Sequence, residues 1–295
     1  MFANFAALKN SVLNKSPKTI VVAAAADLNS LEAIRDAEKE LNLKYLLVGE
    51  AAKIKQIAAG IGFAVNAEAI IDAATEEEAA AKAVELIRNG SAEVLMKGNL
   101  QTATLLKAVL DKEAGIRDGG LLSHLTVLEV PTYNKLMFIT DAGMNINPDL
   151  AQKVSIVENA VKFMNNLGYN CPSVAVLAAV ETVNEKMPET VDAKALVELN
   201  KNGEISGCLI EGPLSFDLAV SPESAAIKGV NSQISGDVDL FLVPNIATGN
   251  IMCKALIYLG NAKMAGCVLG AKAPIILVSR GATAEEKLLS ILLAL

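Results

Sequence analysis

The sequence predicts an α/β protein with a mostly parallel sheet and two domains. Short apolar runs alternate with longer segments of helical periodicity, which is typical of strands alternating with helices. The runs are continuously apolar, as in strands that are buried on both faces. The chain has 295 residues, which suits one large domain or two ordinary ones at about 150 residues per domain.

The first part of the chain predicts strands that are each followed by a helix. We expect these strands at residues 19–25, 44–48, 69–71 and 93–96. The first helix is expected to begin with a capping box formed by Asn29 and Glu32. The second helix runs to about residue 59. A third helix begins at Thr75, where acidic residues follow, and ends at Gly90.

The pattern changes after Gly119 and Gly120. Residues 121–130 and 135–140 flank a Pro-Thr-Tyr-Asn turn and predict an antiparallel hairpin. Asn147 is expected to cap a helix that runs from Pro148 to Gly168. Further strands are expected at residues 173–177, 207–210, 239–243 and 274–278, with helices at about 249–262 and from Thr283. Crossings at 119–120 and 266–270 then divide the chain into domain 1, residues 1–120 and 270–295, and domain 2, residues 121–269.

Composition excludes several classes of function. The net charge is −7 and the apolar fraction is 52%, which argues against disorder and against a duplex nucleic-acid binder, because the latter needs a basic surface. Aromatic residues make up 4% of the chain, too few for a platform that stacks single-stranded bases. Mean hydropathy is +0.39, but no apolar run approaches the roughly 18 residues that span a bilayer. We therefore expect neither nucleic acid nor membrane as a partner.

The cysteines favour a reducing compartment. None of the four, Cys171, Cys208, Cys253 and Cys267, forms a C-x-x-C pair, and the chain has one histidine, so a zinc site is not expected. We interpret the cysteines as small buried side chains in a reducing cytosol. Residues 1–15 have the pattern of an amphipathic helix rather than a signal peptide, which agrees with the cytoplasm. Asp237 and Asp239 could bind a metal, but a turn before a strand explains them better.

Polar turns follow several of the expected strands. They occupy residues 97–99, 141–147, 211–217, 244–250 and 279–281. In open α/β sheets, ligands bind beyond the carboxyl ends of the strands, although ordinary turn chemistry also needs Gly, Asn and Asp. The candidate binding residues in these turns are Lys97, Asn99, Asp141, Asn145, Asn245 and Asn250. Ser123 and His124 in the expected hairpin and Lys254 in the following helix are further candidates. A lone histidine such as His124 also fits a structural role.

Arg280 is one of only four arginines and falls between an expected strand and a helix N-terminus. Free backbone N–H groups at such a position favour an anion, and a guanidinium adds bidentate recognition of phosphate. Thr283 and Glu286 have the spacing of a capping box. Glu285 or Glu286 could instead be a base beside the anion site, and both interpretations stay open.

At these same turns the sequence resembles the phosphate acetyl/butyryltransferase family, and its butyryl branch most. The similar segments are MKGNLQTATLLKAVL (96–110), GLLSHLTVLEVPTYNKLMFITDAGMNINPDL (120–150), EGPLSFDLAVS (211–221), VPNIATGNIMCKAL (243–256) and VSRGATAEEK (278–287). The resemblance implies a two-domain fold like that of isocitrate/isopropylmalate dehydrogenases, with the active site in a cleft between the domains. It also implies interconversion of acyl-CoA plus inorganic phosphate with acyl phosphate plus CoA, without a cofactor.

The resemblance also implies roles for residues. Ser279 and Arg280 match the pair that binds the phosphoryl group, and Glu286 matches the base that acts on the CoA thiol, with Glu285 as the alternative. Asn145, Asn250 or Ser123 could stabilise the carbonyl oxyanion, and Lys97 and Lys254 could offset phosphate charge. We expect a homodimer or a higher homo-oligomer.

Other functions remain as alternatives. They are a phosphate acetyltransferase, a non-catalytic acyl-CoA-binding protein, a fatty acyl-phosphate synthase acting on acyl carrier protein, and an isocitrate-type dehydrogenase. The synthase would need a basic docking patch, and the dehydrogenase would need a cluster of arginines for the substrate carboxylates.

Overall fold

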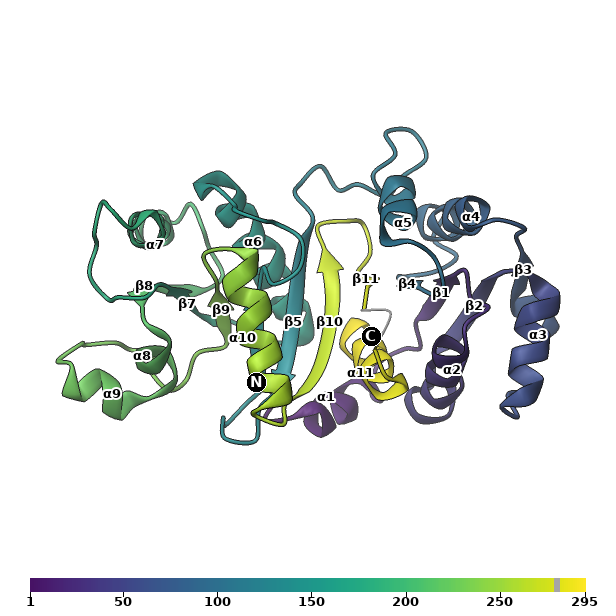
Figure 1. Cartoon of the computed structure of the whole chain (residues 1–295), viewed down its shortest axis with the longest axis horizontal. Coiled ribbons are helices and arrows are strands. Elements are labelled where there is room, and N and C mark those ends of the chain that lie inside the picture. The colour runs from purple at the N-terminus through teal and green to yellow at the C-terminus, as the bar shows by residue number, and fades with distance from the viewer. Residues whose placement is uncertain (279–281) are drawn as a thin grey trace. The chain divides into compact units, whose positions relative to one another are not determined.

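The computed structural model describes residues 1–278 and 282–295 of the chain (Figure 1). The chain forms two compact units: unit 1 comprises Met1–Asn4 and Leu121–Met264, and unit 2 comprises Phe5–Gly120 and Ala265–Leu295. The sequence predicts the second division after residue 269, and it predicts residues 1–4 in domain 1, which corresponds to unit 2. Each unit is an α/β structure, and each is described by itself.

Unit 2 contains a mostly parallel sheet with strand order β3-β2-β1-β4-β11-β10. The strands are β1 (Thr19–Ala23), β2 (Lys44–Gly49), β3 (Ile70–Asp72), β4 (Val94–Lys97), β10 (Lys263–Leu269) and β11 (Ile275–Ile276). Strand β1 is parallel to β2 and β4, and β11 is parallel to β4 but antiparallel to β10. The four strands predicted before residue 100 are confirmed, with ends that differ by one or two residues, and the strand predicted at 274–278 is the shorter β11.

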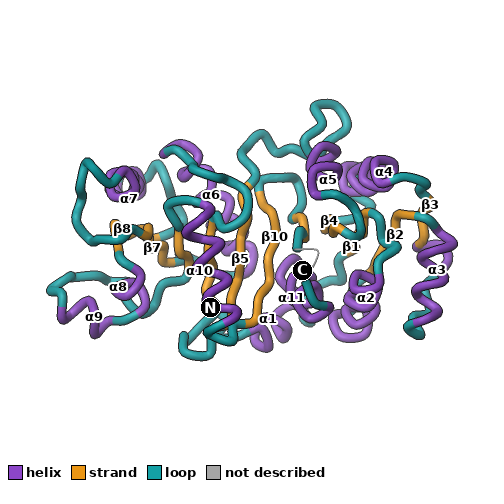
Figure 2. Tube along the Cα trace, in the orientation of Figure 1, coloured by secondary structure: helices purple, strands orange, loops and turns teal. Residues whose placement is uncertain are grey.

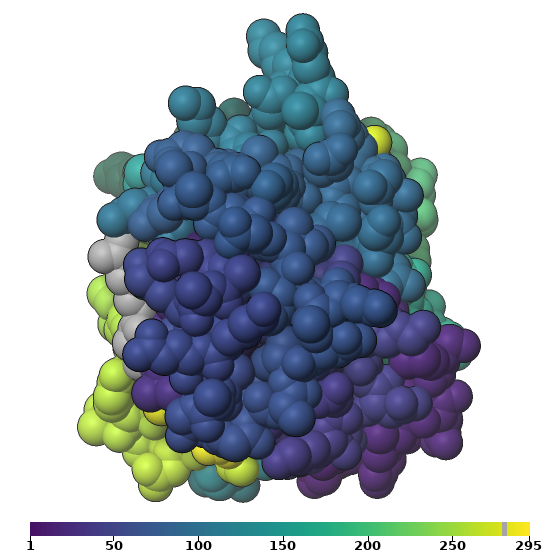
Figure 3. Space-filling view, turned by 90° about the vertical axis from the view of Figure 1, so that its right-hand side faces the viewer, coloured from purple at the N-terminus to yellow at the C-terminus, as the bar shows by residue number. Residues whose placement is uncertain are grey.

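Helices cover both faces of this sheet (Figure 2). They are α1 (Phe5–Val12), α2 (Leu28–Leu41), α3 (Ala51–Gly60), α4 (Glu76–Arg88), α5 (Thr102–Val109) and α11 (Ala284–Ala294), with a short 3-10 turn at Ala67–Ala69. Helices α4 and α5 pack together on one face, and α2 and α11 pack together on the other. The purple and blue atoms in Figure 3 show the side of unit 2 formed by the N-terminal part of the chain.

The predicted start of α4 is confirmed, whereas the predicted capping box of α2 is not. Thr75 caps α4 by accepting a hydrogen bond from the Glu78 N–H, as predicted. The capping box expected from Asn29 and Glu32 is wrong, because Asp27 is the N-cap of α2 and accepts from the Ser30 N–H. Aspartate is as good an N-cap as asparagine, so the sequence offered two starts and the earlier one is used.

Unit 1 contains a sheet with strand order β5-β6-β9-β7-β8. The strands are β5 (Ser123–Glu129), β6 (Met137–Thr140), β7 (Ser173–Leu177), β8 (Leu209–Leu214) and β9 (Leu240–Leu242). Strands β5 and β6 form the predicted antiparallel hairpin, while β6, β9, β7 and β8 are parallel. Strand β5 therefore runs in the opposite direction to the four parallel strands.

The helices of unit 1 are α6 (Leu150–Leu167), α7 (Pro188–Lys201), α8 (Phe216–Val220), α9 (Pro222–Ile227) and α10 (Ile246–Tyr258). Helix α6 ends at Gly168 as predicted, but its N-cap is Asp149, which forms a capping box with Gln152, rather than Asn147. Apolar side chains from β6, β7 and β9 pack with Leu214 and Leu218 around Phe241 to form the core. In the described part of the chain, no helix is long and apolar enough to cross a membrane.

Candidate functional site

The topology of unit 1 gathers several predicted residues at one edge of its sheet. Because β6, β7, β8 and β9 are parallel, their carboxyl ends share that edge, and β5 starts there because it is antiparallel to β6. Ser123 and His124 begin β5, and Asp141 to Asn145 follow β6. Asn245 follows β9. Residues far apart in the sequence therefore meet at the edge where α/β proteins bind ligands.

Asp141 fixes this edge through four hydrogen bonds. Its Oδ1 accepts from the N–H groups of Gly143 and Met144, both at 2.8 Å. Its Oδ2 accepts from the His124 N–H at 3.0 Å and from Asn145 Nδ2 at 2.6 Å. The residue is 2% exposed. A carboxylate with both oxygens engaged in this way orders the turn and joins it to the start of β5.

The His124 ring packs against the turn that Asp141 orders. A side chain at Gly143 would place its Cβ 3.0 Å from the imidazole, so glycine allows this close approach. Nδ1 of the imidazole lies 3.3 Å from Thr126 Oγ1. Burial lowers the pKa of His124, and the negative charge of Asp141 opposes that shift only in part. The imidazole is therefore neutral at pH 7 and can act as a hydrogen-bond donor or acceptor without adding charge.

Amide side chains surround the same turn. Asn145 Nδ2 also donates to the carbonyl of Leu122 at 2.9 Å, and Asn250 Nδ2 donates to the carbonyl of Ala142 at 3.4 Å. Asn159 of α6 donates to Ser123 Oγ at 3.1 Å. The structure thus brings Ser123, His124, Asp141, Asn145 and Asn250 together in unit 1.

Asn245 and Lys254 lie at the start and in the second half of α10, and the Ile246 N–H donates to the Ile146 carbonyl in the turn after β6 at 3.1 Å. Asn245 is the N-cap of α10, and its Oδ1 accepts from the N–H and the hydroxyl of Thr248. Lys254 is exposed on the same helix. Both assignments as substrate-binding residues stay predictions.

In unit 2, the turn after β4 packs tightly on the turn after β1. The N–H groups of Gly98 and Asn99 donate to the carbonyls of Ala23 and Ala24, both at 2.8 Å. A Cβ at Gly98 would lie 2.3 Å from the Ala24 oxygen, so only glycine fits there. Lys97 is buried, and its Nζ donates to the carbonyls of Gly98 and Leu100. Its ammonium therefore supports the fold of this turn as well as adding positive charge to it.

The first turn of α11 carries the predicted carboxylates. Thr283 and Glu286 form the predicted capping box: Glu286 Oε2 accepts from the Thr283 N–H at 2.7 Å, and Thr283 Oγ1 accepts from the Glu286 N–H at 3.2 Å. Glu285 is exposed. Ser279 and Arg280, which immediately precede this region, lie outside the described residues. Their assignment to phosphate binding stays a prediction.

The buried thiols are unsuited to nucleophilic catalysis. Burial raises the pKa of Cys208 and of Cys253 to about 11 and that of Cys267 to about 12. These groups are thiols at neutral pH, whereas the thiolate is the nucleophile. Cys171 is exposed, so the expectation that all four cysteines are buried was wrong for this one.

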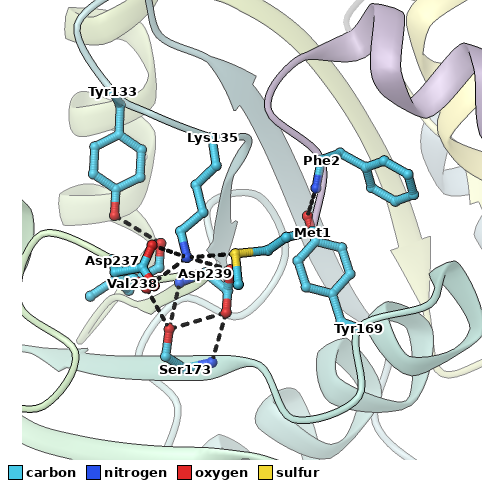
Figure 4. Close-up of polar contacts among 9 residues, drawn as sticks. All are labelled: Met1, Phe2, Tyr133, Lys135, Tyr169, Ser173, Asp237, Val238 and Asp239. Atoms are coloured by element: carbon cyan, nitrogen blue, oxygen red, sulfur yellow. Dashed lines mark hydrogen bonds and ion pairs between the residues drawn. The ribbon is translucent and has the colours of Figure 1, made fainter.

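The two aspartates considered as metal ligands are paired with a lysine instead (Figure 4). Lys135 Nζ lies 2.7 Å from Asp239 Oδ1 and 2.8 Å from Asp237 Oδ1. The other oxygen of Asp239 accepts from the N–H and the hydroxyl of Ser173, and Lys135 also contacts Met1 Sδ at 3.2 Å. Within residues 1–278 and 282–295, no group of three or more His, Cys, Asp or Glu side chains is arranged to hold a metal ion.

Some residues that contact the candidate site residues could not be identified from the sequence. Asn159 and Thr126 contact Ser123 and His124, and their positions within a helix and a strand gave no signal of this. In unit 2, Lys287 forms an ion pair with Asp27, the N-cap of α2. Lys287 falls inside the segment VSRGATAEEK, but a lysine in a helix is ordinarily solvated, so only the fold identifies its partner.

Comparison with known proteins adds independent information. A family model described as "Phosphate acetyl/butaryl transferase" matches residues 75–295. The chain is 42% identical over 294 residues to a phosphate butyryltransferase of Clostridium acetobutylicum, covering 100% of this chain and 98% of that protein. It is 41% identical over 276 residues to a phosphate acetyltransferase of Rhizobium meliloti, covering 94% of this chain and 87% of that protein.

A solved structure is similar over nearly the same range. It is a branched-chain phosphotransacylase from Enterococcus faecalis V583, with a TM-score of 0.83 and 33% sequence identity. The match covers 94% of this chain and 97% of that one. Both fold and sequence are therefore similar across both units.

Proposed function

Since the chain belongs to the phosphate acetyl/butyryltransferase family, we propose that it transfers a short acyl group between CoA and inorganic phosphate. The reaction is acyl-CoA + phosphate ⇌ acyl phosphate + CoA, with butyryl-CoA as the proposed substrate. The observation that carries this is 42% identity to a phosphate butyryltransferase over the full length of the chain. A phosphate acetyltransferase is the alternative, because a relative with that name is 41% identical.

The proposed chemistry is direct attack in a complex of the enzyme with both substrates. In the direction of CoA acylation, Glu286 or Glu285 removes the thiol proton of CoA, and the thiolate attacks the carbonyl carbon of acyl phosphate. The new C–S bond forms, the C–O bond to phosphate breaks, and phosphate leaves with its electron pair. The raised pKa values of Cys208, Cys253 and Cys267 support a mechanism without an acyl-cysteine intermediate.

Each charge in this reaction has a proposed partner. Arg280 and Ser279 hold the phosphoryl group, because a guanidinium fork matches two phosphate oxygens. Lys97 and Lys254 add positive charge. Asn145, Asn250 or Ser123 donate to the carbonyl oxyanion. The geometry favours Ser123 among these three, because its hydroxyl accepts from Asn159 and still has a proton to donate. Asn145 Nδ2 already donates to Asp141 and to the Leu122 carbonyl, so it would have to give up one of these bonds.

The remaining features of the proposal concern the whole enzyme. We propose that it uses no metal or other cofactor, and that its arrangement is that of the isocitrate/isopropylmalate dehydrogenase-like fold with the active site between two domains. A crystal structure with CoA and phosphate tests both. We also propose the cytoplasm, because the four cysteines are unpaired thiols. Cell fractionation tests this location.

A homodimer or higher homo-oligomer is the proposed assembly. Helix α10 is apolar over much of its surface, and it exposes Ile251 (68%) and Tyr258 (78%), followed by Leu259 (86%). Large apolar side chains gathered on one exposed helix favour a protein contact. Light scattering of the purified protein tests the assembly, and a monomer at all concentrations would contradict it.

The function is tested by release of CoA from acetyl-, propionyl-, butyryl- and acetoacetyl-CoA, with and without phosphate. We expect release that requires phosphate and is fastest with butyryl-CoA. Arg280→Ala is expected to lower the rate by about 10²-fold or more, because one lost charge-stabilising donor typically costs 10²–10³. Its circular dichroism spectrum should match the wild type. Near-normal phosphate-dependent release by this variant would remove Arg280 from the phosphate site.

A further inference from the structure

Lys287 occupies a position that disfavours a cation. It lies in the first turn of α11, where the helix dipole opposes positive charge. Its side chain is 7% exposed, so the ammonium has also lost most of its water, at a cost that one ion pair often does not recover. The stability of α11 alone does not explain a lysine here.

The partners of Lys287 lie at the start of another helix. Its Nζ is 2.7 Å from Asp27 Oδ2 and 3.0 Å from Ser30 Oγ. Asp27 is the N-cap of α2, and the same Oδ2 also accepts from the Ser30 N–H and hydroxyl. Burial raises the pKa of Asp27, but the hydrogen bonds from Lys287 and Ser30 outweigh it and hold the pKa below its usual value. Asp27 is thus an anion that faces a cation.

The ion pair between Lys287 and Asp27 is linked through the chain to the turns of unit 2 that carry predicted site residues. Asp27 ends the segment after β1, and the carbonyls of Ala23 and Ala24 at the beginning of that segment accept from the N–H groups of Gly98 and Asn99. At the other end of the contact, Lys287 directly follows Glu285 and Glu286. The ion pair therefore connects the first turn of α11 to the segment on which the turn after β4 packs.

We propose that Asp27 and Lys287 are positioning residues for acyl transfer, which seat the first turn of α11 so that its carboxylate meets the CoA thiol. The inference rests on the proposed function. It assigns neither residue to contact with substrate. Removing the pair leaves the base present but displaced, and a displacement of about 1 Å can cost up to 10²-fold in rate.

Unit 1 offers a matched control. Lys153 Nζ lies 2.6 Å from Asp192 Oδ2, with side chains 6% and 25% exposed. The corresponding values for Lys287 and Asp27 are 2.7 Å, 7% and 26%. Lys153→Met therefore removes an ion pair of nearly equal burial and length that has no part in the proposed site.

The experiment compares Lys287→Met, Asp27→Asn, the double variant, Lys287→Arg and Lys153→Met in the phosphate-dependent CoA-release assay and in thermal unfolding. We expect Lys287→Met to lower kcat by about 10- to 100-fold with little change in KM for butyryl-CoA or phosphate. The double variant should be no slower than the slower single variant, because both changes remove one contact. Lys287→Arg should recover part of kcat. Lys153→Met should lower the Tm by about as much as Lys287→Met does, and its kcat should stay at the wild-type value.

Two results would overturn the proposal. One is a wild-type kcat in folded Lys287→Met or folded Asp27→Asn, the milder variant because asparagine is also a good N-cap. The other is an equal loss of kcat in Lys153→Met, which would mean that the loss follows general destabilisation. A wild-type protein that releases no CoA in the presence of phosphate would instead refute the proposed function.

Discussion

At the scale of single residues, hydrogen-bonded carboxylates in this protein organise turns. Asp141 accepts four hydrogen bonds in unit 1, and Asp27 accepts from Ser30 and Lys287 in unit 2. Each one joins the end of a strand to a second element at the edge where the predicted site residues lie. Pre-organised donors stabilise charge without reorganising during the reaction, and such carboxylates provide that rigidity.

Glu286 has two possible roles, and one substitution separates them. Gln at the third helical position also completes a capping box, so Glu286→Gln keeps the bond to the Thr283 N–H and removes only the base. We expect a fall in kcat of about 10²–10⁴-fold with a Tm close to that of the wild type. Steady-state kinetics and thermal unfolding measure these two effects.

Glu285→Gln is the paired control, because Glu285 lies in the same turn but outside the capping box. If Glu285→Gln loses the activity and Glu286→Gln keeps it, the base is Glu285 and Glu286 is only a cap. Full activity in both variants would exclude both residues as the base.

At the scale of elements, the strands were predicted well and the starts of helices less well. Continuous apolar runs identify buried strands such as β1 and β7, because a strand that is covered on both faces accepts few polar side chains. Several residues near a helix start can cap it, so Asn29 and Asn147 were chosen where Asp27 and Asp149 are used. Strand β10 was missed, since Val268 is the one β-branched residue in its sequence KMAGCVL.

The candidate site was predictable in its residue types and less so in its contacts. Polar turns after strands identified Asp141 and Asn145 because strand ends converge in an α/β sheet, whereas His124 was considered as a lone histidine in the expected hairpin. Partners such as Asn159 and Lys287 come from helices elsewhere in the sequence. Their positions depend on tertiary packing, which periodicity does not reveal.

The contact between the turns after β1 and β4 predicts a large effect from one methyl group. In Gly98→Ala the new Cβ would lie 2.3 Å from the Ala24 oxygen and 2.8 Å from the Ala23 oxygen. Both are backbone atoms, so we expect a loss of about 3 kcal/mol or more and reduced activity. Urea unfolding measures the first and CoA release the second.

Gly60→Ala provides the control for this substitution. Nothing lies within 4 Å of a Cβ at Gly60, which is the last residue of α3, so we expect a neutral or slightly stabilising change. Equal stability of Gly98→Ala and Gly60→Ala would contradict the close packing of the two turns.

At the scale of the whole molecule, an acidic chain is proposed to act on two polyanions. The net charge of −7 does not favour phosphate or CoA at long range. Recognition is therefore expected to be local, from Arg280, the lysines, backbone N–H groups and the neutral donors around His124. The residues proposed for this recognition come from both units.

The central claim is acyl transfer to phosphate, and ³¹P NMR of the products tests it most directly. With protein, butyryl-CoA and phosphate together, we expect a new acyl phosphate resonance that grows in step with released CoA. No such resonance should arise when phosphate or protein is left out. Release of CoA without acyl phosphate from the start of the reaction would indicate a thioesterase, and binding of butyryl-CoA with no product would indicate a non-catalytic protein. Either result would contradict the account.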